Sequence, residues 1–205
     1  MKIWGRRNSI NVQKVLWCAD ELGLQYERTD AGMAFGVVNE PAYRAMNPNG
    51  RVPTIDDDGF VLWESNAIVR YLAAKHGAGS LYPASLQARA NADRWMDWCT
   101  STLAAPMTTL FWQLIRTPAE KRDVRAIEDA RAQAEDLFRI ADAAVATGPY
   151  VAGEALTMGD IPLGCFTYRW KALPIERPVL AALDAWHERL AARAPFRNNV
   201  MLPLS

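Results

Sequence analysis

The sequence predicts a small α/β domain of element order βαβαββα, followed by an all-helical domain. Two observations lead to this prediction. Strand-like segments occur only before residue 64, and the first of them form a strand–helix–strand unit, which favours parallel pairing. Beyond residue 85 every apolar pattern has helical spacing. We therefore expect one domain over residues 1–77 and a second over 86–205, with a linker at 78–85.

The first elements are a short strand and an amphipathic helix. Residues 2–5 are a strand candidate that stops at a glycine. Ser9 then precedes a set of apolar residues at helical spacing, and Gly23 lies where a helix commonly ends. Residues 25–30 alternate weakly between apolar and polar side chains, so we expect a second strand there.

An irregular segment and a hairpin follow. Residues 31–46 contain two glycines and a proline and leave room for one short helix near 42–46. The turn sequence NPNG at 47–50 comes before a pair of strands within 52–63, joined by a hairpin turn at DDDG, and these strands must be antiparallel. A helix is then expected over 64–76.

Four helices are expected in the second half. Their ranges are 86–116, 119–144, 157–172 and 179–192. We expect a kink or break at Pro106, because proline lacks the N–H that an interior helical position requires. Asp160 is expected to cap the third of these helices, so that its loss harms folding more than catalysis.

Composition excludes several classes of protein. The 23 lysine and arginine residues balance 23 acidic ones, which gives no electrostatic reason to expect nucleic acid or an anionic membrane as partner. No stretch approaches the roughly 20 apolar residues of a membrane span. Cys18, Cys99 and Cys165 have no metal-ligand spacing, and we interpret them as buried thiols of a cytoplasmic protein with no metal site.

Three short segments of the first domain could carry chemistry, and each also has a structural explanation. Ser9 is either an ordinary helix N-cap or a hydroxyl that donates to a bound anion. A cis bond between Val52 and Pro53 would free the Val52 backbone to pair with an extended peptide. Glu64 and Ser65 either cap a helix or bind the ammonium and carboxylate groups of an α-amino acid.

Taken together and in this order, the segments resemble the cytosolic glutathione transferases of the bacterial, serine-type (theta-like) kind. The resemblance implies a thioredoxin-like first domain and covers nearly the whole chain. It is carried by SINVQKV at 9–15, NPNGRVP at 47–53, ESNAIVRYL at 64–72, TMGDI at 157–161 and RAPF at 193–196.

The resemblance implies two candidate donors for the sulfur of glutathione. Ser9 matches the hydroxyl that holds this sulfur in serine-type relatives, and we rank it first. Asn11 ranks second, because its side-chain amide can also donate to a sulfur. The nucleophile would then be the thiolate of the co-substrate glutathione, rather than any protein cysteine.

It also implies contacts for the rest of the tripeptide. Val52 should pair with the cysteinyl backbone beside a cis Pro53, and Glu64 and Ser65 should hold the γ-glutamyl end. Arg51 could reach the γ-glutamyl carboxylate. Relatives often place His or Lys about a dozen positions before Arg51, where this chain has Val38-Asn39-Glu40, so Asn39 or a distant arginine is expected at the glycyl end.

The second substrate is expected against the aromatic-rich helix of the second domain. We interpret Trp95, Met96 and Trp98 as core or dimer-interface residues. Beyond Pro106, a more suitable set lines an apolar pocket for a hydrophobic electrophile: Met107, Phe111 and Trp112.

The predicted function is conjugation of glutathione to a hydrophobic electrophile, or reduction of a peroxide or disulfide with it. A glutathione-dependent isomerase or dehalogenase is a second hypothesis, and a non-catalytic binding or regulatory protein of the same fold is a third. A homodimer is expected from the resemblance and from the apolar load on the last two predicted helices.

Overall fold

The first half of the chain folds around a four-stranded sheet in the computed structural model, which describes all 205 residues. The strand order is β2-β1-β3-β4, with β1 and β2 parallel and the β1–β3 and β3–β4 pairs antiparallel. The bounds are β1 (Lys2–Trp4), β2 (Glu27–Thr29), β3 (Thr54–Asp57) and β4 (Phe60–Trp63). This is the thioredoxin-like arrangement expected from the sequence, with its parallel start and antiparallel hairpin.

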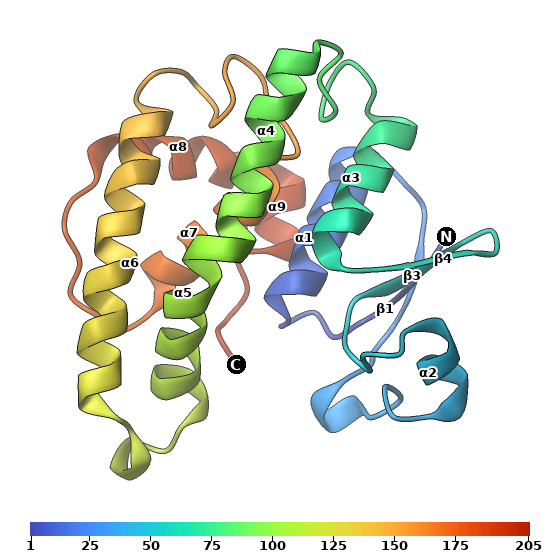
Figure 1. Cartoon of the computed structure of the whole chain (residues 1–205), viewed down its shortest axis with the longest axis horizontal. Helices are drawn as coiled ribbons and strands as arrows, with labels where there is room; N and C mark the ends of the chain where they lie inside the picture. Colours follow the sequence, from blue (N-terminus) through green and yellow to red (C-terminus); the bar gives the residue numbers. More distant parts are fainter.

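Helices cover both sides of this sheet. α1 (Ile10–Glu21) and α3 (Ser65–His76) pack against each other on one side, and α2 (Pro41–Met46) lies on the other (Figure 1). Ile3 and Ile55, paired across β1 and β3, are fully buried. A single 3₁₀ turn at Met33–Phe35 is the only other element between β2 and α2.

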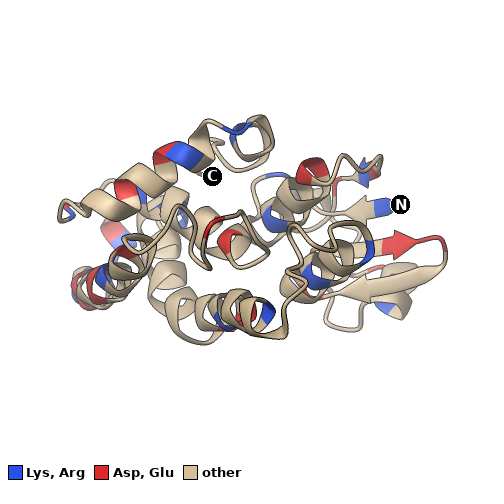
Figure 2. Ribbon diagram, turned by 90° about the horizontal axis from the view of Figure 1, so that it is seen from above, with Lys and Arg blue, Asp and Glu red and all other residues tan.

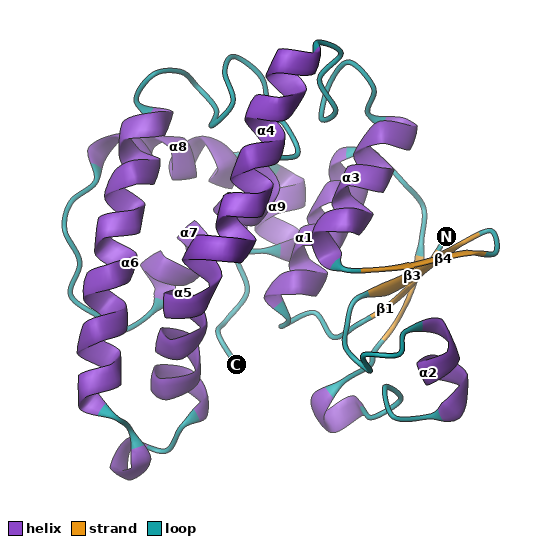
Figure 3. Ribbon diagram, in the orientation of Figure 1, coloured by secondary structure: helices purple, strands orange, loops and turns teal.

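The second half is entirely helical, as predicted (Figure 3). Its α-helices are α4 (Leu86–Trp98), α5 (Ala104–Phe111), α6 (Val124–Val145), α7 (Asp160–Ala172), α8 (Ala181–Ala191) and α9 (Ala194–Asn199). Wide, π-helical turns continue α4 at Cys99–Leu103 and α5 at Trp112–Arg116.

The helical half differs from the prediction at the turn near Pro106, at the start of α6 and in the presence of α9. The irregular turn precedes Pro106 instead of lying at it, because the missing proline N–H leaves the carbonyl of Thr102 without its helical partner. α6 begins at Val124 because the Asp123 side chain caps it, accepting from the Ala126 amide at 3.0 Å. α9 was not predicted, since six residues are too few to show a periodic pattern.

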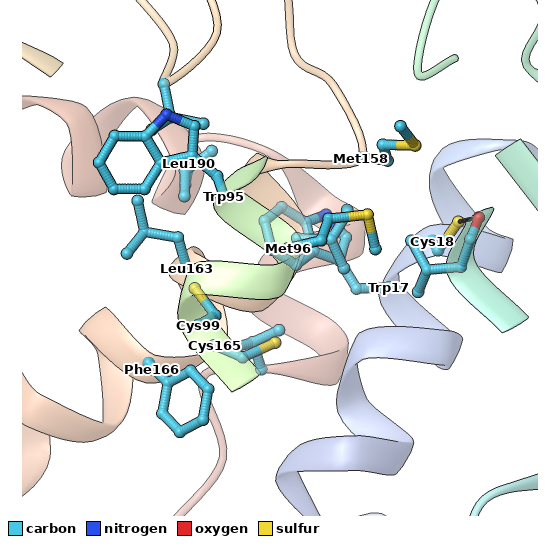
Figure 4. Packing of buried hydrophobic residues seen from close by; sticks show 14 of the residues in the cluster. Trp17, Cys18, Trp95, Met96, Cys99, Met158, Leu163, Cys165, Phe166 and Leu190 are labelled. Carbon is cyan, nitrogen blue, oxygen red and sulfur yellow. Dashed lines mark hydrogen bonds between the residues drawn. The ribbon is translucent and has the colours of Figure 1, made fainter. Parts of the chain in front are cut away.

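α7 forms the centre of the helical half. It is buried on nearly all sides, and its Trp170 stacks on Phe138 of α6 at 4.9 Å between ring centroids. The apolar residues of α7 are therefore used inside the chain, which corrects the expectation that they favour a dimer. Trp95 and Met96 lie in the same core, as predicted (Figure 4). Trp98 is partly buried and packs at the edge of this core.

α1 contacts the helical half as well as its own half of the chain. The Trp17 ring meets Phe196 edge-on at 4.7 Å and donates from its indole nitrogen to Glu21 at 2.9 Å. Arg193 grips the same Glu21 carboxylate with two hydrogen bonds of 2.7 and 2.6 Å. The helix that carries the candidate site is thus fixed to both halves.

Charged residues of both signs are interspersed (Figure 2), and the three thiols are buried, as the composition suggested. Basic and acidic residues are interspersed over the ribbon in Figure 2. None of the helices combines the length and the apolar character needed to cross a membrane. Cys18, Cys99 and Cys165 are all buried and unpaired, and burial raises the pKa of Cys18 and Cys165 to about 12.

Asp160 has the capping role expected of it. Its buried carboxylate accepts hydrogen bonds from the amides of Thr157 and Val151 at 2.8 and 2.9 Å, and from the Trp186 indole at 3.1 Å. Burial raises the pKa of Asp160 to about 6, although these hydrogen bonds favour the charged form. One side chain therefore joins the start of α7 to α8 and to the preceding loop.

Replacement of Asp160 by Ala should lower the free energy of unfolding by about 3 kcal/mol or more, because it removes the acceptor of four buried donors. Urea denaturation of the purified protein measures this loss. Asp129→Ala is the matched control: its carboxylate is exposed and 3.9 Å from Arg125, so the change should stay within about 0.5 kcal/mol. Equal losses for the two variants would contradict the capping role.

Candidate functional site

The three sequence segments meet where the two halves of the chain face each other. The start of α1, the loop before β3 and the start of α3 together line a small groove of about 110 Å³. The peptide bond between Val52 and Pro53 is cis, as expected. The lining residues of this groove are Asn11, Asn47, Asn49, Arg51, Val52, Pro53, Glu64 and Ser65.

Hydrogen bonds fix the loop that leads into Pro53. The carbonyl of Arg51 accepts from the Tyr43 hydroxyl at 2.7 Å and from the side-chain amide of Asn47 at 2.9 Å. Both donors also contact the hydroxyl of Thr54 in β3. The backbone beside Val52 is consequently held in one position at the edge of the groove.

Ser9 occupies the N-cap position of α1 without capping it. Its backbone is extended, yet its hydroxyl makes no hydrogen bond to the helix amides. Its exposure is only 8 %, and it lines a second, larger cleft beside the groove. The hydroxyl therefore stays available to a ligand, next to amides that the helix itself leaves unpaired.

Asn11 is oriented by two donors. Its Oδ1 accepts from the ammonium of Lys14 at 3.0 Å and from the hydroxyl of Ser65 at 3.3 Å. An ammonium can only donate, so this contact requires the amide oxygen on the Lys14 side. The Nδ2 of Asn11 is left free to donate to a ligand.

Lys14 is a buried cation with no acidic partner. Only 3 % of it is exposed, its one hydrogen bond is to Asn11, and the ring of Phe166 lies 5.3 Å away. Burial lowers the pKa of Lys14 because the charged form loses its hydration. A positive charge is thus placed just behind the first turn of α1.

Glu64 adopts a conformation rare for a residue with a side chain. Its φ is 71° and its ψ is 111°, and its carboxylate does not cap α3. Ser65 opens that helix and is buried beside the groove. Such backbone conformations occur most often at binding sites, where the surrounding structure holds them in place.

The larger cleft has a volume of about 550 Å³ and is called here the arginine cleft. Ser9, Asn39 and Val52 form its wall on the sheet side, and Phe111 and Trp112 line it from the helical half. Its other lining residues include Arg6, Arg51, Arg116 and Arg169.

Only two of the three residues predicted for an apolar pocket line this cleft. Phe111 is almost buried and Trp112 is 49 % exposed, whereas Met107 is fully buried in the core and does not line the cleft. Asn39 does line it, and its Oδ1 accepts from Arg44 at 2.9 Å, which leaves its amide nitrogen available. Sequence reasoning missed Arg6, Arg116 and Arg169, which are far apart in the chain and share no motif.

Two families of domains match this chain. The glutathione S-transferase N-terminal domain matches residues 1–74, and the glutathione S-transferase C-terminal domain matches residues 103–194. The chain belongs to the glutathione S-transferase family. Its sheet half and helical half correspond to the two matched domains.

Several relatives are similar over the full length. Glutathione S-transferase GstB of Escherichia coli strain K12 is 40 % identical, with 99 % of each chain covered. A theta-class glutathione S-transferase of the citrus canker pathogen Xanthomonas axonopodis pv. citri, solved with glutathione bound, has a TM-score of 0.96 and 53 % identity, covering 100 % of this chain and 98 % of its own. Glutathione S-transferase 3 of Zea mays is 29 % identical, with 98 % of this chain and 93 % of its own covered.

Replacement of Lys14 by Met should raise the free energy of unfolding at pH 7 by about 1 kcal/mol or more, because it removes an uncompensated buried charge at nearly constant volume. The pKa of Lys14 is lowered from 10.5, so the folded form binds fewer protons than the unfolded chain at high pH. The free energy of unfolding of the wild type should therefore rise relative to that of the variant as the pH rises toward 10.5.

Urea denaturation at pH 7 and pH 10 measures both effects. Lys121→Met, at an exposed position in a 3₁₀ turn, is the matched control and should change the unfolding free energy little at either pH. A Lys14→Met variant that is less stable than wild type at pH 7 would show that the ammonium contributes to folding.

Proposed function

We propose that this protein is a glutathione transferase that binds glutathione along the small groove and directs its sulfur to the start of α1. The observation that carries the proposal is the uncommitted hydroxyl of Ser9. It lies at a helix N-terminus, and the helix does not use it as a cap. The solved relative from Xanthomonas axonopodis, which contains glutathione, supports the same ligand here.

The first turn of α1 is suited to a thiolate. A thiol with a pKa near 8.5 is only a few per cent ionised at pH 7, and donors at a helix N-terminus favour its ionised form. Ser9 and the Nδ2 of Asn11 supply hydrogen bonds, and the charge of Lys14 acts from behind. In the reaction, the sulfur forms a bond to the electrophilic carbon and the leaving group departs with the bonding electrons. The thiol proton goes to solvent.

The γ-glutamyl end fits the start of α3. The Glu64 carboxylate, which caps no helix, would pair with the ligand ammonium. The amide and hydroxyl of Ser65 would bind the ligand carboxylate at the positive end of α3. Val52 would pair with the cysteinyl backbone between these ends, and Arg51 lies close enough to the groove to join the γ-glutamyl site.

The glycyl end would extend from the groove into the arginine cleft. Asn39 lines that cleft with its amide nitrogen free, because Arg44 already binds its oxygen. Asn39 would then hold the glycyl carboxylate. This assigns a partner to the end of glutathione for which the sequence offered no basic residue at the usual spacing.

A homodimer in the cytoplasm completes the proposal. Three buried, unpaired thiols suit a reducing compartment. The aromatic ring of Phe60, half-exposed on the β3–β4 hairpin beside Tyr71, is a candidate contact for a second copy. Peroxidase and disulfide reductase activities with glutathione stay predictions.

Ser9→Ala should lower kcat/KM for glutathione conjugation about tenfold or more, and should raise the pKa of the bound thiol by about one unit, because each unit corresponds to about 1.4 kcal/mol of lost thiolate stabilisation. Stopped-flow absorbance of the thiolate against pH measures this pKa. Ser9→Thr, which keeps a hydroxyl, is the matched control and should retain most of the activity. Wild-type turnover in Ser9→Ala beside an inactive Asn11→Ala would transfer the role to Asn11.

Glu64→Gln should weaken glutathione binding about tenfold by removing the charge opposite the ligand ammonium, with the thiol pKa unchanged. Isothermal titration calorimetry gives the affinity. Glu40→Gln, an exposed residue outside the groove and the cleft, is the control. A wild type that gives no heat with glutathione would support the alternative of a non-catalytic protein of the same fold.

A further inference from the structure

We propose that the second substrate carries a carboxylate or a similar anionic group, which binds in the arginine cleft between Arg6, Arg116 and Arg169. This inference rests on the proposed function and narrows the class of electrophile. It replaces the neutral, apolar molecule expected from the sequence with an anion that also has a flat or apolar part.

Arg169 is the first piece of evidence. It lies in α7 and is only 8 % exposed, yet its guanidinium makes no hydrogen bond or ion pair within the protein and faces the cleft. Its only close partner is the ring of Phe111, 3.9 Å below it. Burial, together with the charges of Arg116 and Arg6, lowers the pKa of Arg169 to about 10. A buried, unpaired charge is destabilising unless a partner arrives.

Two more guanidinium groups gather at the same place. Arg116 lies 5.2 Å from the centre of the Phe111 ring and 5.6 Å from that of Trp112. The Nε atoms of Arg6 and Arg116 are buried without a hydrogen-bond partner. Like charges this close repel each other, so the arrangement is costly by itself and becomes favourable around an anion.

The cleft contains no compensating acid. No aspartate or glutamate is among its lining residues. One Nη of Arg116 donates to the Ser205 oxygen at 2.5 Å.

Several arginines elsewhere in the chain form ion pairs, as in Arg28 with Asp30, Arg70 with Asp93 and Arg193 with Glu21. The chain has no net charge, so general basicity does not explain the cluster. The charges of Arg6 and Arg169, which no acidic side chain of the cleft balances, therefore point to a ligand.

The carboxylates of glutathione do not neutralise the charges of Arg116 and Arg169. Its γ-glutamyl carboxylate is assigned to Ser65 at the start of α3, and its glycyl carboxylate to the side of the cleft formed by Asn39. Arg116 and Arg169 belong to the helical half, beside Phe111 and Trp112. Positive charge thus remains at the place where the second substrate must meet the sulfur.

The chemistry of these groups defines the ligand further. A guanidinium presents parallel donors that match the two oxygens of a carboxylate. The partly exposed face of Trp112 and the ring edge of Phe111 suit an apolar or aromatic body attached to that carboxylate. An aromatic carboxylate with an activated leaving group meets both requirements.

The test compares 4-chloro-3-nitrobenzoate with 4-chloro-3-nitrobenzamide at saturating glutathione. Both undergo the same substitution, in which sulfur bonds to the ring carbon and chloride leaves with the bonding electrons. The expected kcat/KM, divided by each uncatalysed rate constant, is about tenfold or more higher for the benzoate. Equal values, or a preference for the amide, would overturn the inference.

Variants assign the preference to the cleft. Arg169→Met should abolish the preference for the benzoate over the benzamide, and Arg169→Lys should retain part of it. Arg125→Met, at a fully solvated position on α6, is the matched control and should behave as wild type. A preference that survives in Arg169→Met, Arg116→Met and Arg6→Met alike would show that these arginines do not bind the anion.

A binding measurement keeps the two proposals distinguishable. Calorimetry of 3-nitrobenzoate and 3-nitrobenzamide with protein saturated in S-methylglutathione should show at least tenfold tighter binding of the benzoate. If glutathione itself produces no heat, the proposed function fails. The titration of the two probes into protein without a glutathione analogue then still tests whether the arginine cleft binds an anion. Equal affinities of the two probes in either titration would overturn the inference.

Discussion

The first turn of α1 keeps its hydrogen-bond donors open toward a cleft, and the rest of the site depends on this. A helix start normally satisfies its amides with the side chain of its own cap. Here the Ser9 hydroxyl is not used in that way, and Asn11 is turned by Lys14 and Ser65 so that its amide nitrogen is free. The positive end of the helix is therefore left for a ligand.

The buried charges of this protein are of two kinds, those that stabilise the fold and those that await a ligand. Asp160 is surrounded by donors from the preceding loop and from α8, and it links the start of α7 to both. Lys14 and Arg169 are equally inaccessible, but neither has an acidic partner. Groups of the first kind stabilise the fold, whereas groups of the second kind lower its stability and gain their partner only when a ligand binds.

Periodicity and turn chemistry in the sequence were enough to predict the element order, the antiparallel hairpin and the position of the groove. The NPNG turn, the proline that follows it and the Glu64–Ser65 pair are local signals, and the groove is built from these local segments. Burial along one helix was harder to predict. Met107 and Phe111 are one turn apart in α5, yet Met107 packs into the core and only Phe111 reaches the cleft. The arginine cleft could not be predicted, since its members come from separate elements that only the tertiary structure brings together.

The contacts of α1 with the helical half have a consequence for engineering within this family. Glu21 and Trp17 belong to the sheet half by sequence, but their partners Arg193 and Phe196 lie near the other end of the chain. A chimaera cut at the linker would separate an ion pair and an aromatic contact that no local segment replaces. Modules exchanged between relatives must therefore carry the last helix together with the first, because the boundary along the chain is not a boundary in space.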